Sequence, residues 1–390
     1  MEAIYLDNAA TTPLDPRVRE DMQPYLSTVF GNPSSLHRAG REARAAVEKA
    51  RGQVAQLIGA KPNEIVFTAS GTEADNLAII GALEALPPGN YHIIASAFEH
   101  PAVLATCRHL ERRGVALTLL PVTAEGLVDP DALKKALRPE TRLVSIMAAN
   151  NVIGTVQPVA ELAQIAREHG ALFHTDAVQT AGRIPLDMGA SSIDLLSLSA
   201  HKFHGPKGIG ALYVREGVKL SPIIHGGGQE SGLRSATENV AGIAGLGRAA
   251  EIAHETMAEE AARTVALRDR IIDGIGISNA YLIGHRFRRL PGHVCLGFAG
   301  QEGEAIKLLL SLDQAGIAVS TGSACSAHRA SEPSYVLSAL GFDPFRARGS
   351  IRITLGRFNA EDEIERFLEV LRREVAGLRP ITSQRTQSRA

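Results

Sequence analysis

The sequence predicts an α/β protein with a large domain, built on a mostly parallel sheet, and a second, smaller α+β domain. Two observations predict this class. From residue 64 the chain repeats a buried apolar strand, a turn and a helix, an order typical of a parallel sheet covered by helices on both faces. The chain of 390 residues is also long enough for two domains, and residues 280–375 mix short strands with helices.

Ahead of this repeat, the chain predicts one short strand and one long helix. Residues 4–8 (IYLDN) form the strand, which leads into the small and hydroxylated residues 9–13 (AATTP). Residues 37–58 place apolar side chains at helical spacing and charged side chains on the other face. We therefore expect an amphipathic helix that ends at Gly59.

The repeating part predicts strands at 64–68, 91–96, 143–147, 171–176 and 193–198, and helices at 73–86, 102–113 and 158–170. Ligands of such sheets bind beyond the carboxyl ends of the strands. The residues that the chain places at this edge are Thr72, His100, Asn151, Asp176 and the run from Ser199 to Lys202. We expect these distant residues to share one site.

The later part of the chain predicts the second domain. An Ala-rich helix over residues 241–275 is expected to connect the two domains, with strands at 294–298 and 350–355 and helices at 302–313 and 360–376 beyond it. We expect a large domain of residues 14–255 and a small domain of residues 1–13 and 256–378. Residues 379–390 are polar and are expected to form a mobile tail.

Composition excludes several function classes. The 41 basic and 42 acidic side chains give a formal net charge of −1, which argues against charge-driven binding of nucleic acid or a membrane surface. No apolar run reaches transmembrane length, and the start MEAIYLDNAATTP lacks the pattern of a signal peptide. The three cysteines show no CxxC spacing, so we expect a reduced, cytoplasmic protein without a disulfide framework. No metal site is expected, because the 13 histidines form no HExxH motif.

Lys202 is the first candidate for chemistry. It ends a buried strand between Ser199, His201 and a Gly-Pro turn, where its amine could form a Schiff base with an aldehyde cofactor while Ser199 and His201 face that cofactor's phosphate. The alternative is a solvated lysine at the end of a strand, as most lysines are solvated.

Other residues at the same edge suit the same cofactor. Gly71 and Thr72 open a helix, whose N–H groups and dipole can hold a phosphate, although an ordinary N-cap is the commoner reason for such a threonine. Asp176 could pair with a protonated pyridine nitrogen, and Gln179 could reach the ring hydroxyl. His100 could stack on a flat ring or transfer protons. Taken singly each is an unremarkable polar residue, but together they indicate pyridoxal phosphate.

Cys325 is the second candidate for chemistry. It lies in a segment of small and polar residues (320–333), where nearby His328 and Arg329 favour the reactive thiolate. Cys107 and Cys295 lie in a predicted helix and an apolar strand, where buried and inert thiols are usual. An ordinary surface thiol is the alternative for Cys325, but a mobile cysteine beside a pyridoxal phosphate lysine indicates sulfur chemistry.

Two further features carry weaker signals. Arg352 could hold a substrate carboxylate with a two-pronged hydrogen bond, or it could form a surface ion pair. The glycine-rich run 225–230 (HGGGQE) matches neither a P-loop nor a dinucleotide-binding motif, and a tight loop near a phosphate is the better interpretation.

As a set, these motifs resemble the cysteine desulfurases of the NifS/IscS type, in the class-V aminotransferase branch of fold-type I pyridoxal phosphate enzymes. The resemblance runs from Tyr5 to about Val375. The motifs that carry it are 5–12 (YLDNAATT), 31–35 (GNPSS), 67–73 (FTASGTE), 199–202 (SAHK), 226–230 (GGGQE) and 322–326 (GSACS). It implies a large domain with a seven-stranded type of sheet and a smaller domain that carries the cysteine loop.

The resemblance also implies a role for each candidate. Lys202 would be the Schiff-base lysine, and Cys325 would receive sulfur from L-cysteine as a persulfide. The cofactor's phosphate would be held by Gly71, Thr72, Ser199, His201 and, from the partner subunit of a homodimer, Thr237. Its ring would be held by Asp176, Gln179, Asn151 and His100, and the substrate carboxylate by Arg352 and Asn151. Two positions depart from the family pattern, namely Val152, where glutamate is usual, and Pro101, where histidine or serine is common.

The activity implied is conversion of L-cysteine to L-alanine, with sulfur passed from Cys325 to an acceptor protein. That acceptor could serve iron–sulfur cluster assembly or the thiolation of tRNA or DNA, and the sequence leaves this open. An aminotransferase or β-lyase would use the same cofactor residues without needing Cys325, and selenocysteine lyase activity could accompany the main one. A sulfur-carrier or scaffold subunit without enzyme activity would leave the converging site residues idle.

Overall fold

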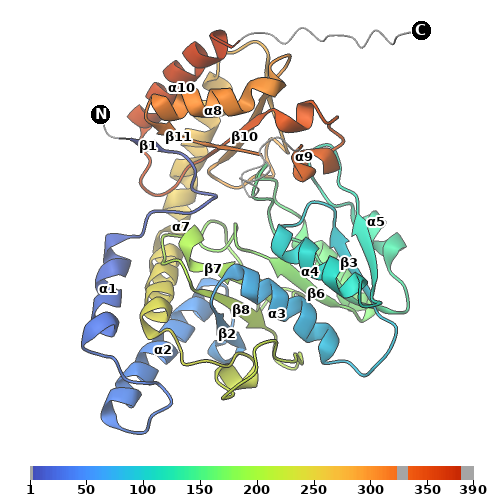
Figure 1. The fold of residues 1–390 in the computed structure, drawn as a ribbon, viewed down its shortest axis with the longest axis vertical. Coiled ribbons are helices and arrows are strands. Elements are labelled where there is room, and N and C mark those ends of the chain that lie inside the picture. Colours follow the sequence, from blue (N-terminus) through green and yellow to red (C-terminus); the bar gives the residue numbers. More distant parts are fainter. Residues whose placement is uncertain (1–2, 323–332, 379–390) are drawn as a thin grey trace.

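The large sheet is the centre of the fold in the computed structural model, which describes residues 3–322 and 333–378 (Figure 1). In spatial order its strands are β2 (Ile65–Thr68), β8 (Gly210–Val214), β7 (Leu195–Ser199), β6 (Leu172–Asp176), β5 (Thr141–Ser145), β3 (His92–Ser96) and β4 (Ala116–Leu120). Only β8 runs antiparallel to its neighbours. It follows β7 after ten residues, which is too short a connection for the crossover that a parallel pair requires. The predicted α/β fold with a mostly parallel sheet is confirmed.

Helices cover both faces of this sheet, as alternating strand residues show. Ile93 and Leu195 pack in the apolar cluster of α3 (Gly71–Glu84) and α4 (Pro101–Glu111). Their neighbours Ile94 and Leu196 pack in the cluster of α2 (Arg38–Leu57) and α6 (Val159–His169). The strands are therefore buried on both sides, and polar side chains gather at their ends. Two further helices, α1 (Pro16–Ser27) and α5 (Pro130–Ala136), complete this part of the chain.

A second core lies at the other end of the molecule, in the upper part of Figure 1. Its antiparallel sheet has the order β12 (Ser320–Thr321), β13 (Ser350–Thr354), β10 (His293–Phe298) and β9 (Ala280–Leu282). Three helices belong to it: α8 (Ala305–Gln314), α9 (Tyr335–Ala339) and α10 (Glu361–Ala376). The start of the chain joins this part, because β1 (Ile4–Tyr5) pairs in parallel with β11 (Ile317–Ala318). The division at residues 13, 255 and 378 stays a prediction.

The helix α7 (Val240–Gly274) connects the two cores, as Figure 1 shows, and at 35 residues it is about 50 Å long. Its first half packs against α1 and α2, and its second half contacts α10 and β10. Gly247 allows the close approach of α2, because a Cβ atom there would lie 2.6 Å from Ala50 Cβ. The long helix thus fixes the position of the second core relative to the large sheet.

The sequence-based helices and strands agree with the structure apart from shifted ends and missed short elements. The helix expected from residue 73 begins at Gly71, because the Ser70 side chain caps it and accepts a hydrogen bond from the Glu73 backbone N–H at 3.1 Å. The elements that the sequence analysis did not predict are α1, β4, α5, β8, β9, β11, β12 and α9. Most have seven residues or fewer and carry too little periodicity to be recognised.

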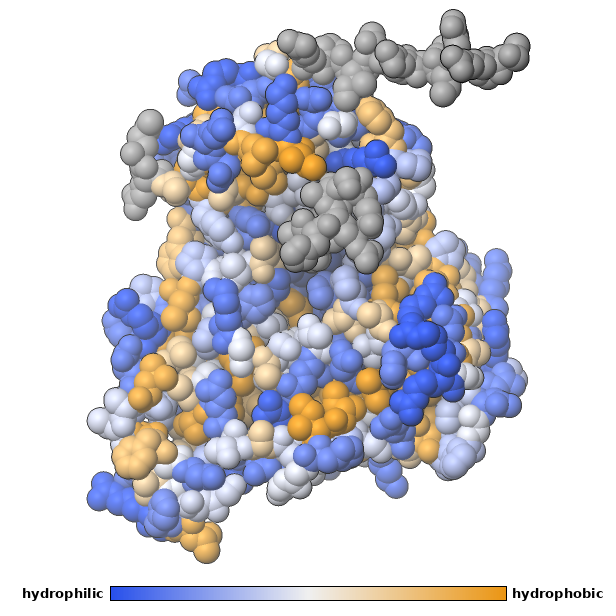
Figure 2. All heavy atoms as spheres, viewed as in Figure 1, coloured by the Kyte–Doolittle hydropathy of each residue, from blue (hydrophilic) through white to orange (hydrophobic). Residues whose placement is uncertain are grey.

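Hydrophilic side chains cover much of the face shown in Figure 2, and apolar side chains form separate patches on it. One patch lies over α8, whose Ile306 and Leu310 are exposed. Among the described helices, none is both long and apolar enough to cross a membrane.

Candidate active site

A cavity of about 390 Å³ opens at the carboxyl edge of the large sheet. The predicted site residues that line it are Gly71, Thr72, His100, Asn151, Asp176, Gln179, Ser199, His201, Lys202 and Arg352. They come from five separate strand ends or helix starts and from β13 of the second core. The sheet thus brings together residues that are up to 281 positions apart in the chain, which is the separation of Gly71 and Arg352. Their roles stay predictions.

Lys202 follows β7 in a single turn of 3₁₀ helix (Ala200–Lys202). Its Nζ donates to the carbonyl oxygens of Ala9, at 2.7 Å, and Ala10, at 2.8 Å. The partly buried Arg183 holds the same turn, donating to the backbone oxygens of Lys202, at 3.0 Å, and Asn8, at 2.9 Å. The N-terminal segment of residues 8–12 therefore lies directly against the lysine. Sequence reasoning missed this contact, although the run of small residues AATT is the signal for it.

His201 contacts the same N-terminal segment. Its Nδ1 lies 3.1 Å from Thr11 Oγ1, and its carbonyl oxygen accepts the backbone N–H of Thr12 at 2.9 Å. Burial, together with the positive charge of Lys202, lowers the pKa of His201 to about 4. The ring is therefore neutral at physiological pH and can donate or accept one hydrogen bond toward the cavity.

Asp176 ends β6 and is buried. Its Oδ1 accepts the backbone N–H of Val178 at 2.9 Å. Burial raises the pKa of Asp176, while the charges of His100 and Lys202 and the Val178 hydrogen bond act in the opposite direction. Next to it, Gln179 donates from Nε2 to the Ala9 oxygen at 3.0 Å, and its buried Oε1 has no hydrogen-bond partner among the described residues. The same holds, within residues 3–322 and 333–378, for the buried Oδ1 atom of Asn151.

The N-terminus of α3 forms another side of the cavity. Gly71 and Thr72 are its first two residues, and Ser199 lies beside them. A Cβ atom on Gly71 would lie 2.7 Å from Val178 Cγ2 and 3.4 Å from Ser199 Cβ, so only glycine fits there without displacing Val178. The free N–H groups and the dipole of this 14-residue helix favour a bound phosphate.

Arg352 lies in the middle of β13 with an exposed fraction of 1%. Its Nη1 donates to the Asn151 oxygen at 3.0 Å, its Nη2 donates to Asp7 Oδ1 at 2.7 Å, and its buried Nε has no partner in the part of the chain that the structure describes. The surface ion pair considered for Arg352 is therefore wrong, since the guanidinium is buried beside the cavity. Sequence reasoning did not identify Asp7 as its partner.

The two departures from the family pattern have local explanations. Pro101 is the first residue of α4, and His100 caps this helix by accepting the backbone N–H of Ala102 on Nδ1 at 3.2 Å. Val152 is buried in a small apolar cluster with Phe98 and Met147. Valine at position 152 thus serves packing below the cavity, while Asn151 keeps its place on the wall.

Two predicted residues do not line this cavity. Thr237 lies at a separate cavity of about 230 Å³, with Arg234, Glu238 and Asn239. Cys325 lies outside the described residues, as do His328 and Arg329. The described residues on either side of that segment are close to the site, since Ser320 is directly opposite Arg352 in the β12–β13 ladder.

The two other cysteines are buried, as predicted. Burial raises the pKa of Cys107 to about 12 and that of Cys295 to about 11. Both thiols therefore keep their protons at physiological pH and are poor nucleophiles.

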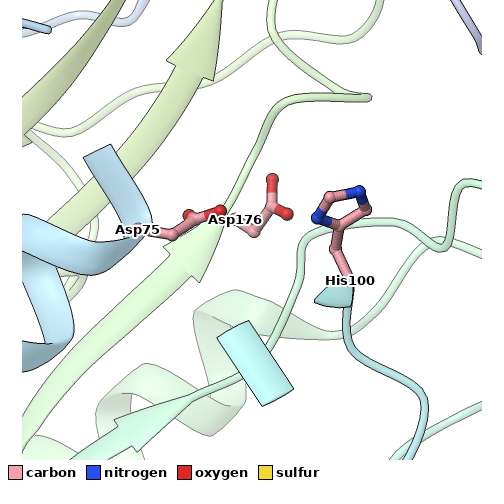
Figure 3. Close-up of side chains that lie close together, drawn as sticks. All are labelled: Asp75, His100 and Asp176. Carbon is pink, nitrogen blue, oxygen red and sulfur yellow. The ribbon is translucent and has the colours of Figure 1, made fainter. Parts of the chain in front are cut away.

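A second acidic side chain, which sequence reasoning missed, joins the cavity wall. Asp75 comes from α3 and points toward Asp176, with His100 on the other side of Asp176 (Figure 3). Each of the three side chains offers an oxygen or nitrogen atom, and these atoms lie within 4.8 Å of one another. Such a trio could chelate a metal ion, but it belongs to the wall of this cavity, and the expectation of no metal stays a prediction.

Comparison with known proteins identifies the family. The family model described as aminotransferase class-V matches residues 4–367. The chain belongs to this family. It is 53% identical to the cysteine desulfurase IscS of Dictyoglomus turgidum, over 97% of this chain and 96% of that protein. Among solved structures, a NifS-like protein matches with a TM-score of 0.90 and 40% identity, covering 96% of this chain and all of the other. SspA in complex with cysteine matches with a TM-score of 0.81 and 38% identity, over 92% and 100% of the two chains.

The cavity fits pyridoxal phosphate, the cofactor of the cysteine desulfurases in this class-V family. The fit is chemical, because the wall offers one group for each part of the cofactor. The α3 N-terminus suits the phosphate, the buried Asp176 suits the ring nitrogen, and the Lys202 amine suits the aldehyde. The side-chain oxygens of Asn151 and Gln179 have no hydrogen-bond donor among the described residues, and the hydroxyl side of the ring can supply one.

Proposed function

We propose that this protein is a pyridoxal phosphate-dependent cysteine desulfurase, which converts L-cysteine to L-alanine and transfers the sulfur to Cys325 as a persulfide. The observation that carries the proposal is one cavity that unites the amine of Lys202, the buried carboxyl of Asp176 and the buried guanidinium of Arg352. The relatives named as cysteine desulfurases, of which one is 53% identical over nearly the whole chain, support the same reaction.

Bound pyridoxal phosphate supplies an aldehyde that reacts with amines and a ring that withdraws electrons from the substrate Cα atom. Lys202 Nζ accepts the proton from that carbon and returns it at the end of the reaction. Asp176 holds the proton on the ring nitrogen, because a buried carboxylate attracts a positive charge more strongly than a carboxylate in water does. Ser199, His201, Thr72 and Gly71 orient the phosphate.

Arg352 binds the substrate carboxylate in this proposal, with help from the side chain of Asn151. Its Nε is buried and unpartnered, so a carboxylate entering the cavity supplies the acceptor that the guanidinium lacks. His100 is placed at the cavity wall to take the proton of the substrate thiol. Arg352, Asn151 and His100 all line the cavity.

Sulfur transfer requires Cys325. Its thiolate attacks the substrate sulfur, the new S–S bond forms, and the bond between sulfur and the substrate Cβ breaks. The sum is L-cysteine plus the Cys325 thiol giving L-alanine plus the Cys325 persulfide, so carbon is reduced and sulfur is oxidised without an outside reagent. The position of Ser320 opposite Arg352 supports this role, because five residues span at most about 18 Å.

Several wider assignments complete the proposal. Thr237 reaches the phosphate of the partner subunit in a homodimer, which agrees with its place at a separate cavity of its own chain. The persulfide then passes to an acceptor protein of iron–sulfur cluster assembly or of a thiolation pathway. The protein acts in the cytoplasm, and the two-domain division is residues 14–255 against 1–13 with 256–378.

The test is to incubate the purified protein with L-cysteine and a reductant and to quantify alanine and sulfide together. Equal amounts of both are expected. Sulfide with pyruvate and ammonia, in place of alanine, would identify a β-lyase and remove the role of Cys325. The full-length protein should also show the yellow colour of a lysine-bound cofactor before substrate is added.

Three variants separate the roles in this assay. Lys202→Ala is expected to abolish turnover, while Lys207→Ala, at an exposed lysine in the same loop, serves as its control. Cys325→Ala is expected to stop sulfide release and to leave the cofactor's spectral response to L-cysteine intact. Sulfide release by Cys325→Ala at the wild-type rate would exclude a persulfide on that residue.

A further inference from the structure

Asp75 occupies an unusual position for a carboxyl group. It lies on the buried face of α3, between the apolar residues Ala74 and Leu77 of the same helix, with an exposed fraction of 1%. Its side chain points toward Asp176 at the cavity wall (Figure 3). An ionised carboxylate at such a position needs a cation or several hydrogen-bond donors.

The described residues around Asp75 supply neither a strong cation nor several hydrogen-bond donors. Among the described residues a basic side chain near it is His174, with 3.5 Å between His174 Nε2 and Asp75 Oδ1. The His174 ring lies between the hydroxyls of Ser145, at 2.8 Å, and Ser197, at 3.0 Å. Burial lowers the pKa of His174 to about 3, so its ring carries no charge at physiological pH. Asp75 Oδ1 has no hydrogen-bond partner within the described part of the chain.

Asp176 is better supported as an anion than Asp75. It accepts the Val178 N–H at 2.9 Å, and the charges of His100 and Lys202 lower its pKa against the effect of burial. For Asp75, burial raises the pKa well above the usual range and the neighbouring acidic groups Asp176 and Glu99 raise it further, while the Ser197 hydroxyl acts against them. Burial raises the pKa of Glu99 itself to about 8. Two adjoining buried carboxyl groups titrate as a pair, and the first proton is lost from the better-supported member.

We propose that Asp75 is a positioning residue that keeps its proton, so that Asp75 and Asp176 together carry one negative charge, held on Asp176. This charge balances the single positive charge of a protonated pyridine nitrogen. The protonated Asp75 carboxyl also offers a hydrogen-bond donor beside Asp176 at the cavity wall. The inference rests on the proposed function, because it gives the pair its partner in pyridoxal phosphate.

The first test is the pH dependence of thermal stability in the full-length protein stripped of cofactor. A carboxyl whose folded pKa is raised stabilises the fold at low pH, and this contribution is lost as the pH rises toward the folded pKa. Asp75→Asn removes the ionisable proton and keeps the shape of the side chain. The Tm of this variant minus the Tm of the wild type should therefore rise by about 1–2 °C for each pH unit between 5.5 and 8. A difference that is flat or falls with pH overturns the proposal.

Two further variants show whether the pH slope of the Tm difference comes from Asp75. Glu84→Gln, at an exposed carboxyl near the end of the same helix, should show no pH-dependent difference from the wild type. Asp75→Leu carries no ionisable group either and should show the same slope as Asp75→Asn, so either variant decides the outcome if the other does not fold.

The second test uses the cofactor-loaded protein and measures whether a neutral hydrogen-bond donor at position 75 is sufficient for normal cofactor ionisation and activity. Asp75→Leu, which has no donor, should shift the pH midpoint of the cofactor's visible absorption band and lower kcat by about tenfold. Asp75→Asn keeps a neutral N–H donor and should recover most of both changes. Equal effects of the two variants would show that the negative charge of Asp75 matters, and would overturn the proposal.

The two proposals can fail separately. If no alanine forms from L-cysteine in the wild type, the proposed function fails, while the pH slope of the stripped protein still reports the protonation of Asp75. If alanine forms and the slope is absent, only the inference about Asp75 fails.

Discussion

Arg352 is the largest of the side chains that the structure buries almost completely. Oxygen atoms that accept its hydrogen bonds stabilise the buried charge. The Asn151 backbone oxygen and the Asp7 carboxylate accept from its two terminal nitrogens, while Nε has no partner among the residues that the structure describes. A buried guanidinium with an open donor is a strong site for a carboxylate, because solvent does not compete for it.

Arg352→Lys tests this residue. A lysine retains the positive charge but loses the planar fork, so kcat/KM for L-cysteine should fall by about 10–100-fold, mainly through KM. The cofactor's absorption spectrum without substrate should not change. Arg348→Lys, at an exposed arginine nearby, is the control. An unchanged kcat/KM in Arg352→Lys would move the substrate carboxylate to another group.

Sequence position alone predicted the wall residues that close a strand or open a helix, such as Asp176 and Lys202. Strand ends can be recognised from apolar runs, and the carboxyl ends of parallel strands meet at one edge. Asp75 and Asp7 could not be predicted in this way. Asp75 lies inside a helix, and Asp7 meets Arg352 only because the start of the chain packs on the second core.

At the scale of elements, one buried ion pair anchors the glycine-rich run 225–230. Arg51 from α2 donates to both oxygens of Glu230, at 2.8 and 2.7 Å, and Glu230 also accepts the backbone N–H of Phe67 from β2 at 2.8 Å. Glu230 itself has a φ of 48°, a left-handed conformation that is rare for residues other than glycine. The ion pair thus ties a helix, a strand and a strained turn together.

Glu230→Gln should lower the free energy of unfolding by about 3–5 kcal/mol, because it removes the buried carboxylate of Arg51 and leaves the half-exposed Glu48 as its partner among the described residues. Urea denaturation measures this cost. The exposed pair of Lys61 and Glu216, with 2.6 Å between Nζ and Oε2, gives the matched control, and Glu216→Gln should cost less than about 1 kcal/mol. Similar costs for the two variants would mean that the buried pair does not anchor the run.

The elements predicted from the sequence are those whose own residues carry the pattern. Most of the strand and helix repeat between residues 64 and 202 was recognisable because its predicted strands are buried on both faces, whereas the half-exposed β4 was missed. The strands β9, β11 and β12 have only two or three residues each, and pairing with a partner defines them. Their partners lie elsewhere in the chain, so no local pattern could indicate them.

At the scale of the whole molecule, the joint between the two cores contains a second buried ion pair. Asp15, which caps α1, receives hydrogen bonds from Arg17 Nη2 at 2.8 Å and from Arg357 Nη1 at 2.6 Å. Arg357 follows β13 of the second core and also donates to Glu260 of α7 at 2.6 Å. One guanidinium therefore connects the first helix, the connecting helix and the second core.

Asp15→Asn tests this joint, since asparagine still caps the helix but lacks the charge. Hydrogen bonds from Arg17 and Arg357 hold the pKa of Asp15 far below its usual range, although burial acts against them. A carboxyl with a lowered folded pKa stabilises the protein above its unfolded pKa of about 3.9, and this contribution is lost as the pH falls toward the folded pKa. Asp15→Asn should therefore lose about 2–3 kcal/mol of unfolding free energy at pH 7.

The pH dependence of that loss distinguishes Asp15 from Asp75. Between pH 5.5 and 8 the Tm difference between Asp15→Asn and the wild type should be constant, because the wild-type carboxylate is ionised in both the folded and the unfolded chain. Over the same range the difference for Asp75→Asn should grow, because Asp75 keeps its proton only in the folded chain. Thermal melts of the three proteins at several pH values measure both. A slope for Asp15→Asn in this range would mean that the joint depends on another titrating group.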